Sequence, residues 1–192
     1  MLDREGPTSG AAPDGISIRP AHPRDARSFL EAYREAAAEG RRIQTERVDR
    51  TVGFYRRRFG RSWDDAAAHL LALDGDRVVG SLSIRRHIEH PALRHVATLG
   101  MFVRQAYRRR GIGAALMAEA LRWGRLVGVE RIELTVYPHN TPAIALYRSF
   151  GFLEEGRLVR HARKSYGYED EILMAAWIGP EPGPAGAGAE EA

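Results

Sequence analysis

The chain has 192 residues, of which 44% are hydrophobic, and this is enough to bury a substantial core in one domain. It has no cysteine, which excludes disulfides, cysteine zinc sites and an acyl-cysteine intermediate. The net charge is +4, and this basic character is the only feature of the sequence that would support a nucleic-acid binder. No apolar run reaches the ~18 residues that span a bilayer. The N-terminus lacks the pattern of a signal peptide, and we expect a cytoplasmic protein.

Residues 1–14 and 179–192 are rich in glycine, proline and alanine, and we expect a disordered leader and tail around one domain at 15–178. In the first half of the chain, hydrophobic periodicity predicts a strand at 16–19, helices at 23–39 and 49–59, and strands at 70–73, 78–84 and about 95–104. A helix then follows that ends at Gly128, and its core-facing stripe is Ile112, Leu116, Ala120, Trp123 and Val127. The rest of the chain predicts a strand at 131–137, a helix from Asn140 or Thr141 to Phe150, and strands at 152–163 and 171–177. This order indicates a mixed sheet flanked by helices.

A basic turn with two glycines lies between the predicted strand at 95–104 and the helix after it. Residues 107–114 are YRRRGIGA, so three arginines precede Gly111 and Gly113. Backbone N–H groups at a helix start have no internal partner, and the helix dipole adds positive potential there. Glycine also lets a phosphate approach the backbone. The turn therefore predicts a phosphate site, and the alternative is a helix that simply begins on a basic surface. The spacing of the glycines matches neither of the two common nucleotide-binding loops, G-x-x-x-x-G-K-[ST] and G-x-G-x-x-G.

A second motif follows at residues 140–152, NTPAIALYRSFGF. The R-x-x-G-x-G turn at 108–113 and this N-x-x-A-x-x-x-Y-x-x-x-G-F helix resemble the acyl-CoA loop and a later helix of the GNAT superfamily of N-acetyltransferases. The resemblance covers about residues 16–178. It implies an α/β (α+β) fold with a mixed, mostly antiparallel sheet of about seven strands flanked by about four helices. Residues 167–174, GYEDEILM, are similar to the ending of subfamilies that acetylate small amines, amino acids among them.

The resemblance implies acetyl-CoA as the co-substrate. The residues that would wrap its pyrophosphate are Arg108, Arg109, Arg110, Gly111, Ile112, Gly113 and Ala114. The backbone of Phe102 and Val103 would pair with the pantetheine arm, and one of these N–H groups would polarise the thioester carbonyl. Asn140 is expected to be a helix cap, a contact to the amide groups of the cofactor, or both.

The resemblance assigns Tyr147 to the position that protonates the departing thiolate. A phenol with a pKa of ~10 is a suitable acid for this step, and a core aromatic residue on an amphipathic helix is the alternative. Protein N-terminal acetyltransferases of the superfamily often carry a glutamate five residues before the Asn140 position, where this chain has Thr135. Glu133 lies two residues earlier on the same strand face and is our candidate general base, with an exposed strand charge as the alternative.

Other residues could serve as the base or contact the acceptor. Further candidate bases are His139, His87, Glu89 and Asp170. Acceptor contacts are expected from residues 24–60, 85–94 and 161–171. Arg85, Arg86 and His87 would suit an acceptor carboxylate, with solvent-exposed loop charge as the alternative.

The residues and the resemblance together predict an acetyl-CoA-dependent N-acetyltransferase that moves an acetyl group directly to a primary amine of a small molecule. The absence of cysteine favours this direct attack. A protein or peptide N-terminal acetyltransferase and a non-catalytic acyl-CoA-binding regulatory module are the alternatives. We expect no metal, no nucleic acid and no membrane as partners, and the last strands could form a homodimer.

Overall fold

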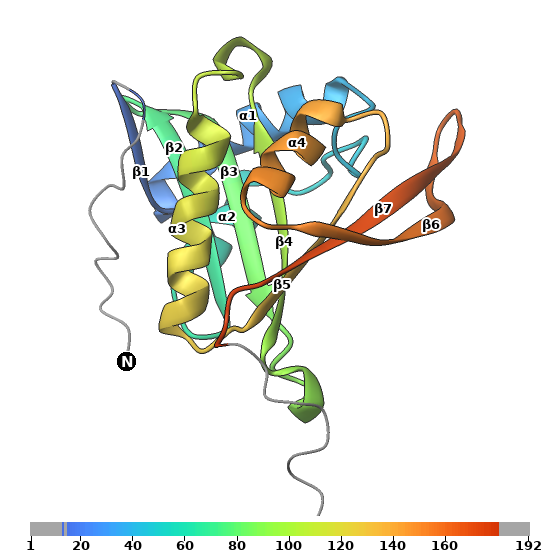
Figure 1. The fold of residues 1–192 in the computed structure, drawn as a ribbon. Helices are drawn as coiled ribbons and strands as arrows, with labels where there is room; N and C mark the ends of the chain where they lie inside the picture. Colours follow the sequence, from blue (N-terminus) through green and yellow to red (C-terminus); the bar gives the residue numbers. More distant parts are fainter. Residues whose placement is uncertain (1–12, 14, 181–192) are drawn as a thin grey trace, which may run out of the picture.

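The computed structural model describes residue 13 and residues 15–180 of the chain. Its centre is one seven-stranded sheet with the strand order β1-β2-β3-β4-β5-β7-β6 (Figure 1). The strands are β1 (Ile16–Pro20), β2 (Ala67–Asp74), β3 (Arg77–Arg86), β4 (Val96–Val103), β5 (Arg131–Val136), β6 (Leu153–Lys164) and β7 (Gly167–Trp177). Only β4 and β5 pair in parallel, and every other neighbouring pair is antiparallel. The predicted mixed, mostly antiparallel sheet is therefore confirmed.

Helices cover both faces of this sheet. They are α1 (Ala26–Ala38), α2 (Val52–Phe59), α3 (Ile112–Leu126) and α4 (Thr141–Ser149). Successive residues of β2 enter two separate cores: Leu70 and Ala72 pack with α3 and α4, whereas Leu71 and Leu73 pack with α1 and α2. A strand buried on both faces is expected to be continuously apolar, and the sequence LLAL of this strand meets that requirement.

The predicted apolar stripe of the helix after the glycine turn is confirmed. Ile112, Leu116, Ala120 and Trp123 are almost wholly buried, and Val127 packs at the edge of the same core. Such i, i+4 spacing places the side chains on one face of α3, so this helix is held to the sheet along its whole length.

The two strands that pair in parallel separate after a short contact. β4 and β5 are in register only at Val96–Arg131, Ala97–Ile132 and Thr98–Glu133. Beyond these pairs β5 continues against β7, while β4 runs on beside β3 to the glycine turn (Figure 1). The gap leaves the facing edges of β4 and β5 without a strand partner, and it opens towards the start of α3.

Several element boundaries differ from the prediction. The first helix begins as a 3-10 turn at Pro23–Asp25, and the second begins only at Val52, where the Thr51 hydroxyl accepts from the Phe54 N–H at 3.3 Å. β7 begins at Gly167, so the last hairpin turns within Ser165 and Tyr166 and is longer than expected. Apart from residues 13, 179 and 180, the predicted leader and tail lie outside the described residues. None of the helices within residues 15–180 is both long and apolar enough to cross a bilayer.

Candidate active site

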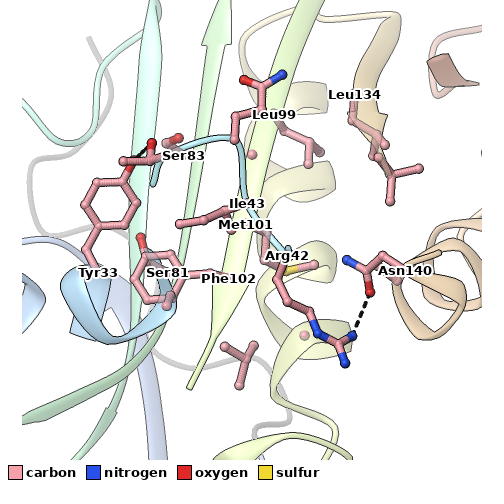
Figure 2. Close-up of a pocket in the computed structure, with 18 of the residues that line it drawn as sticks. Tyr33, Arg42, Ile43, Ser81, Ser83, Leu99, Met101, Phe102, Leu134 and Asn140 are labelled. Carbon is pink, nitrogen blue, oxygen red and sulfur yellow. Dashed lines mark hydrogen bonds between the residues drawn. The ribbon is translucent and has the colours of Figure 1, made fainter. Parts of the chain in front are cut away.

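The gap between β4 and β5 is the centre of a cavity of about 1290 Å³. Its walls come from β3, β4, β5, β7 and α4, from the turn that opens α3, and from residues 42–50, which join α1 to α2. Figure 2 shows that Arg42 extends across the cavity to Asn140, while Met101 and Phe102 of β4 lie behind it. The cavity thus brings together segments that are far apart in the sequence.

The glycine turn presents backbone N–H groups to this cavity. Gly111 stands at the N-cap position of α3 with a φ of 80°, a conformation that glycine adopts without strain. The first N–H bonded to this cap is that of Ala115, which donates to the Gly111 carbonyl at 3.0 Å. The amides of Ile112, Gly113 and Ala114 precede it and have no acceptor within the helix. These residues line the cavity, and the helix dipole makes this corner attractive to an anion.

Gly113 is also required by packing. A β-carbon at this position would lie 3.0 Å from the Leu146 side chain of α4. Glycine therefore lets α4 pack closely against the turn.

The three arginines of the turn have different surroundings. The Arg108 side chain connects the turn to β4 and to the end of α1: its Nε donates to the Val103 carbonyl at 2.9 Å, and its Nη2 pairs with Glu39 at 2.5 Å. Arg109 lines the cavity. Arg110 lies outside the cavity lining, and its guanidinium sits 5.2 Å from the centre of the Tyr107 ring. The predicted pyrophosphate contacts are those of the backbone N–H groups of this turn, and they stay a prediction; of the three arginines, only Arg108 and Arg109 belong to the cavity lining, and the Arg108 side chain is already paired.

The two predicted β4 residues, Phe102 and Val103, both line the cavity. The Phe102 ring stacks on Tyr33 of α1, with ring centroids 5.6 Å apart. This contact ties β4 to the helix on its far face, and it leaves the β4 backbone edge turned to the gap.

Tyr147 of α4 lies in the cavity wall, and its residue is only 6% exposed. Burial raises the pKa of its hydroxyl to about 12. The ring packs against Phe152, with centroids 5.9 Å apart. The structure therefore gives Tyr147 both a core role and a position in the cavity, and its hydroxyl remains protonated at neutral pH.

Asn140 stands at the N-cap position of α4, but its side chain makes no capping hydrogen bond. Its Oδ1 instead accepts from Arg42 Nη1 at 3.1 Å. The predicted side-chain cap is therefore wrong, because Arg42 on the segment over the cavity competes for the same oxygen. Asn140 still lines the cavity, as a ligand contact requires.

Glu133 reaches the cavity on the face of β5 that α3 does not cover. Its Oε1 accepts from Thr98 at 3.4 Å and lies 3.6 Å from His87 Nε2, while its Oε2 lies 3.8 Å from Arg131. Thr135 lines the cavity one step further along the same face. Glu133 is therefore the one predicted base candidate in the cavity lining.

The other candidate bases lie outside that lining, namely His139, His87, Glu89 and Asp170. The expected carboxylate site at residues 85–87 is also displaced from the cavity. Arg86 braces the fold, because its Nη1 donates to the Val127 carbonyl at 2.8 Å and its Nε donates to Arg94.

Glu171, Gln44 and His161 lie in the ranges 24–60 and 161–171, where acceptor contacts are expected, but none of them was singled out from the sequence. Glu171 is buried in the cavity wall, where Gln44 and His161 hydrogen-bond to its carboxylate. The alternation of β7 puts Glu169, Glu171 and Leu173 on one face. An acidic residue directly beside the apolar run ILMAA was the available signal that this face is not simply solvated.

Comparison with known proteins defines the class. Residues 27–152 match the family model described as the acetyltransferase (GNAT) family. The chain therefore belongs to the acetyltransferase (GNAT) family, as the two sequence motifs predicted.

Individual relatives agree with this assignment. The L-amino acid N-acetyltransferase AaaT of Escherichia coli is 40% identical over 107 residues, which cover 54% of this chain and 63% of that protein. A mycothiol acetyltransferase of Pseudarthrobacter chlorophenolicus is 33% identical over 147 residues, which cover 74% of this chain and 44% of that protein. The chain thus spans less than two thirds of the length of these relatives.

Solved structures share the fold. A GNAT-family acetyltransferase from Streptococcus pneumoniae superposes with a TM-score of 0.79 at 26% identity, covering 85% of this chain and 99% of that one. A phosphinothricin acetyltransferase from Sinorhizobium meliloti, solved with AcCoA, has a TM-score of 0.76 at 23% identity and covers 89% of this chain and 95% of that one.

Proposed function

We propose that this protein is an acetyl-CoA-dependent N-acetyltransferase that acetylates a primary amine of a small molecule, with amino acids among the candidate acceptors. The observation that carries the proposal is the gap between β4 and β5, which opens onto the unpartnered amides at the start of α3. The gap suits an extended arm that adds to a free strand edge. The amides suit the phosphates at the other end of such a ligand. The AaaT relative supports an amino acid as the acceptor.

Acetyl-CoA supplies an activated acetyl group as a thioester. The amides of Gly111, Ile112, Gly113 and Ala114 hold its pyrophosphate, and Arg109 adds charge beside them. The Arg108 side chain shapes this turn from behind, and Arg110 contributes positive potential from outside the cavity. The β4 backbone at Phe102 and Val103 pairs with the pantetheine arm. Asn140 contacts the same arm after it releases Arg42.

The chemical step needs a base and an acid. The acceptor nitrogen loses a proton and attacks the thioester carbonyl, a carbon–nitrogen bond forms and the carbon–sulfur bond breaks. Tyr147, a neutral phenol at neutral pH, gives its hydroxyl proton to the departing thiolate as the carbon–sulfur bond breaks. Burial raises its pKa and so makes it a weaker acid than an exposed tyrosine. Glu133 is the base that the sequence favours. The chain has no cysteine, which excludes an acyl-cysteine intermediate and favours direct transfer of the acetyl group to the amine.

The test is thiol release from acetyl-CoA, followed with a thiol reagent across amino acids, polyamines, aminoglycosides and short peptides. The chain itself contributes no thiol background because it has no cysteine. We expect turnover with one class of small amine and a higher melting temperature with acetyl-CoA alone. Turnover of peptides only would favour an N-terminal acetyltransferase. A thermal shift without turnover would favour a non-catalytic acyl-CoA sensor, and no shift at all would contradict the cofactor assignment.

A further inference from the structure

A buried carboxylate faces the cavity from a strand that the catalytic assignment does not use. Glu171 of β7 is only 1% exposed and lines the cavity. It lies on the same face as Leu173, which pairs with Thr135 of β5. A buried carboxylate is costly unless hydrogen bonds or a charge compensate for its lost hydration. The partners of Glu171 therefore indicate what this position is built to do.

Two side chains hold the Glu171 carboxylate from one side. Gln44 Nε2 donates to both of its oxygens, at 2.8 and 3.0 Å, and also lies 3.4 Å from the Thr135 hydroxyl. His161 Nδ1 lies 2.6 Å from Oε2. A carboxylate has about four lone-pair positions. Gln44 occupies two of them, and His161 either donates to a third or accepts a proton from the carboxylate, according to its tautomer. Because Gln44 is neutral, His161 is the one titratable group in direct contact with the carboxylate among the described residues.

A bulge in β6 brings His161 into this contact. Leu158 pairs with Glu171 and Ala162 pairs with Glu169, so residues 159–161 stand opposite a single residue of β7. Within the bulge Arg160 has a φ of 53°, and its N–H donates to the Asp170 side chain at 2.7 Å. Bulges of this kind redirect side chains and often occur beside active sites. The His161 side chain is 51% exposed, so it connects the buried carboxylate to solvent.

The Tyr137 hydroxyl supplies an unused polar atom at the same place. It is buried and has no hydrogen-bond partner among the described residues. Its pKa is raised, first by burial and next by the charge of Glu171, so the group is a neutral phenol beside a carboxylate. A buried polar atom without a partner is costly in a finished protein, and a bound ligand often completes such a site.

The charges around this end of the cavity favour a cation. Other titratable groups gather around Tyr137: Glu171 and Glu169 on β7, Glu46 on the segment between α1 and α2, and Lys164 on β6. The ammonium of Lys164 is already committed, because it donates to the carbonyls of Ile43 and Gln44 at 2.9 and 2.7 Å. Glu169 is itself paired with Arg41 at 3.4 Å and lies 3.8 Å from His139. Among the described residues, neither Glu171 nor Glu46 is paired with an arginine or a lysine, so a cation is favoured beside Glu171.

We propose that Glu171 is a further catalytic residue: it binds the ammonium form of the acceptor together with Tyr137 and takes the proton that the amine must lose. The inference rests on the acetyltransferase function proposed above. One N–H of the ammonium donates to the free lone pair of Glu171, and another donates to the Tyr137 oxygen. The proton moves to the carboxylate and then to Nδ1 of His161, in the tautomer that carries its hydrogen on Nε2, and the exposed ring releases a proton to solvent. The neutral amine attacks the thioester carbonyl with its electron pair. The second proton that the nitrogen loses as the amide forms replaces the one that Tyr147 gives to the thiolate, so no further reactant is needed.

Glu133 is less suited to this task. It already lies near Arg131 and His87, at 3.8 and 3.6 Å, so side chains of this chain already surround its oxygens. It also sits in the last β4–β5 pair, Thr98–Glu133, at the closed end of the gap. Glu171 instead lies one residue beyond the last β5–β7 pair, Val136–Ile172, next to the segment between α1 and α2.

The experiment compares three isosteric variants, Glu171→Gln, Glu133→Gln and Glu169→Gln, with the wild type. Each is assayed by thiol release from acetyl-CoA with the panel amine that the wild type uses best. Glu169 is the matched control, because it is the neighbouring carboxylate on the same face of β7 and contacts Arg41 at 3.4 Å outside the cavity lining. We expect kcat/KM to fall about 10²-fold or more for Glu171→Gln and less than about tenfold for the other two. The thermal shift with acetyl-CoA should persist in all three.

His161→Gln tests the positioning role separately. It should remove one ionisation from the pH profile of kcat/KM, whereas a merely structural histidine would lower the profile without changing its shape. Retention of wild-type kcat/KM by Glu171→Gln, or an equal loss in Glu169→Gln, would overturn the assignment. A wild type that neither turns over any amine of the panel nor binds acetyl-CoA would instead remove the underlying function, and the inference with it.

Discussion

The two ends of the cavity are built in different ways. The end at the start of α3 uses one contiguous segment, residues 107–114, whose backbone amides need only the correct local conformation. The end at Glu171 uses side chains from several elements, and Gln44 and Glu171 are 127 residues apart. Under the proposed function, the co-substrate is therefore held by backbone amides and the acceptor by side chains. Backbone sites tolerate many sequences, whereas a side-chain site can be altered one residue at a time.

The largest expected effect lies between the two ends, at Tyr147. Tyr147→Phe removes only the hydroxyl and keeps the ring contact with Phe152. We expect kcat to fall by about 10²–10⁴-fold because the departing thiolate loses its proton donor. The thermal shift with acetyl-CoA should remain. The control is Tyr168→Phe, because Tyr168 is exposed. An unchanged kcat in Tyr147→Phe would mean that Tyr147 has only a structural role.

The next effect concerns how the acceptor end is held together. Lys164 ties β6 to the segment between α1 and α2 through its two bonds to backbone carbonyls. Lys164→Met should lower the free energy of unfolding by about 2 kcal/mol, since hydrogen bonds to charged groups contribute more than neutral ones. It should also raise the KM for the acceptor and leave acetyl-CoA binding unchanged. Chemical denaturation and steady-state kinetics measure both effects, with the exposed neighbour Arg163→Met as the control.

The same contrast explains what the sequence could predict. The order of strands and helices follows from periodicity, and the turn at 107–114 and the Tyr147 helix follow from short contiguous motifs. Asn140 shows where this stops: its N-cap position was predictable, but its side chain is taken by Arg42, 98 residues away. Glu171 lies in the predicted range 161–171 but was not singled out, for a related reason. Its role depends on Gln44, on a bulge in β6 and on Tyr137, none of which a linear pattern reveals.

A smaller effect tests whether the α3 end depends on backbone conformation. Gly111 and Gly128 have φ values of 80° and 74°, but only Gly111 stands at the phosphate turn. Alanine at either position should cost about 1–2 kcal/mol in stability, because a β-carbon disfavours this conformation. Only Gly111→Ala should weaken acetyl-CoA binding, measured by calorimetry. Equal binding by both variants would mean that the turn does not hold the cofactor.

The last effect comes from His69, which lines the cavity on the side of α1 and α2 and hydrogen-bonds Ser81 at 2.9 Å. Burial, and then the charge of Arg58, lowers its pKa to about 3. Between about pH 3 and pH 6.5 the unfolded chain therefore binds a proton that the folded chain does not, and stability falls as the pH is lowered through this window. The slope from this group is at most about 1.4 kcal/mol per pH unit.

His69→Gln should flatten this part of the pH dependence of unfolding. Any loss of packing in the variant lowers the free energy of unfolding equally at all pH values. The change in the slope of this free energy against pH therefore reflects only the protonation of His69. An unchanged slope would mean that His69 takes up a proton within the folded cavity. In that case the side wall around α1 and α2 would be more hydrated than its burial indicates, and the acceptor would bind among water molecules rather than against a dry aromatic surface.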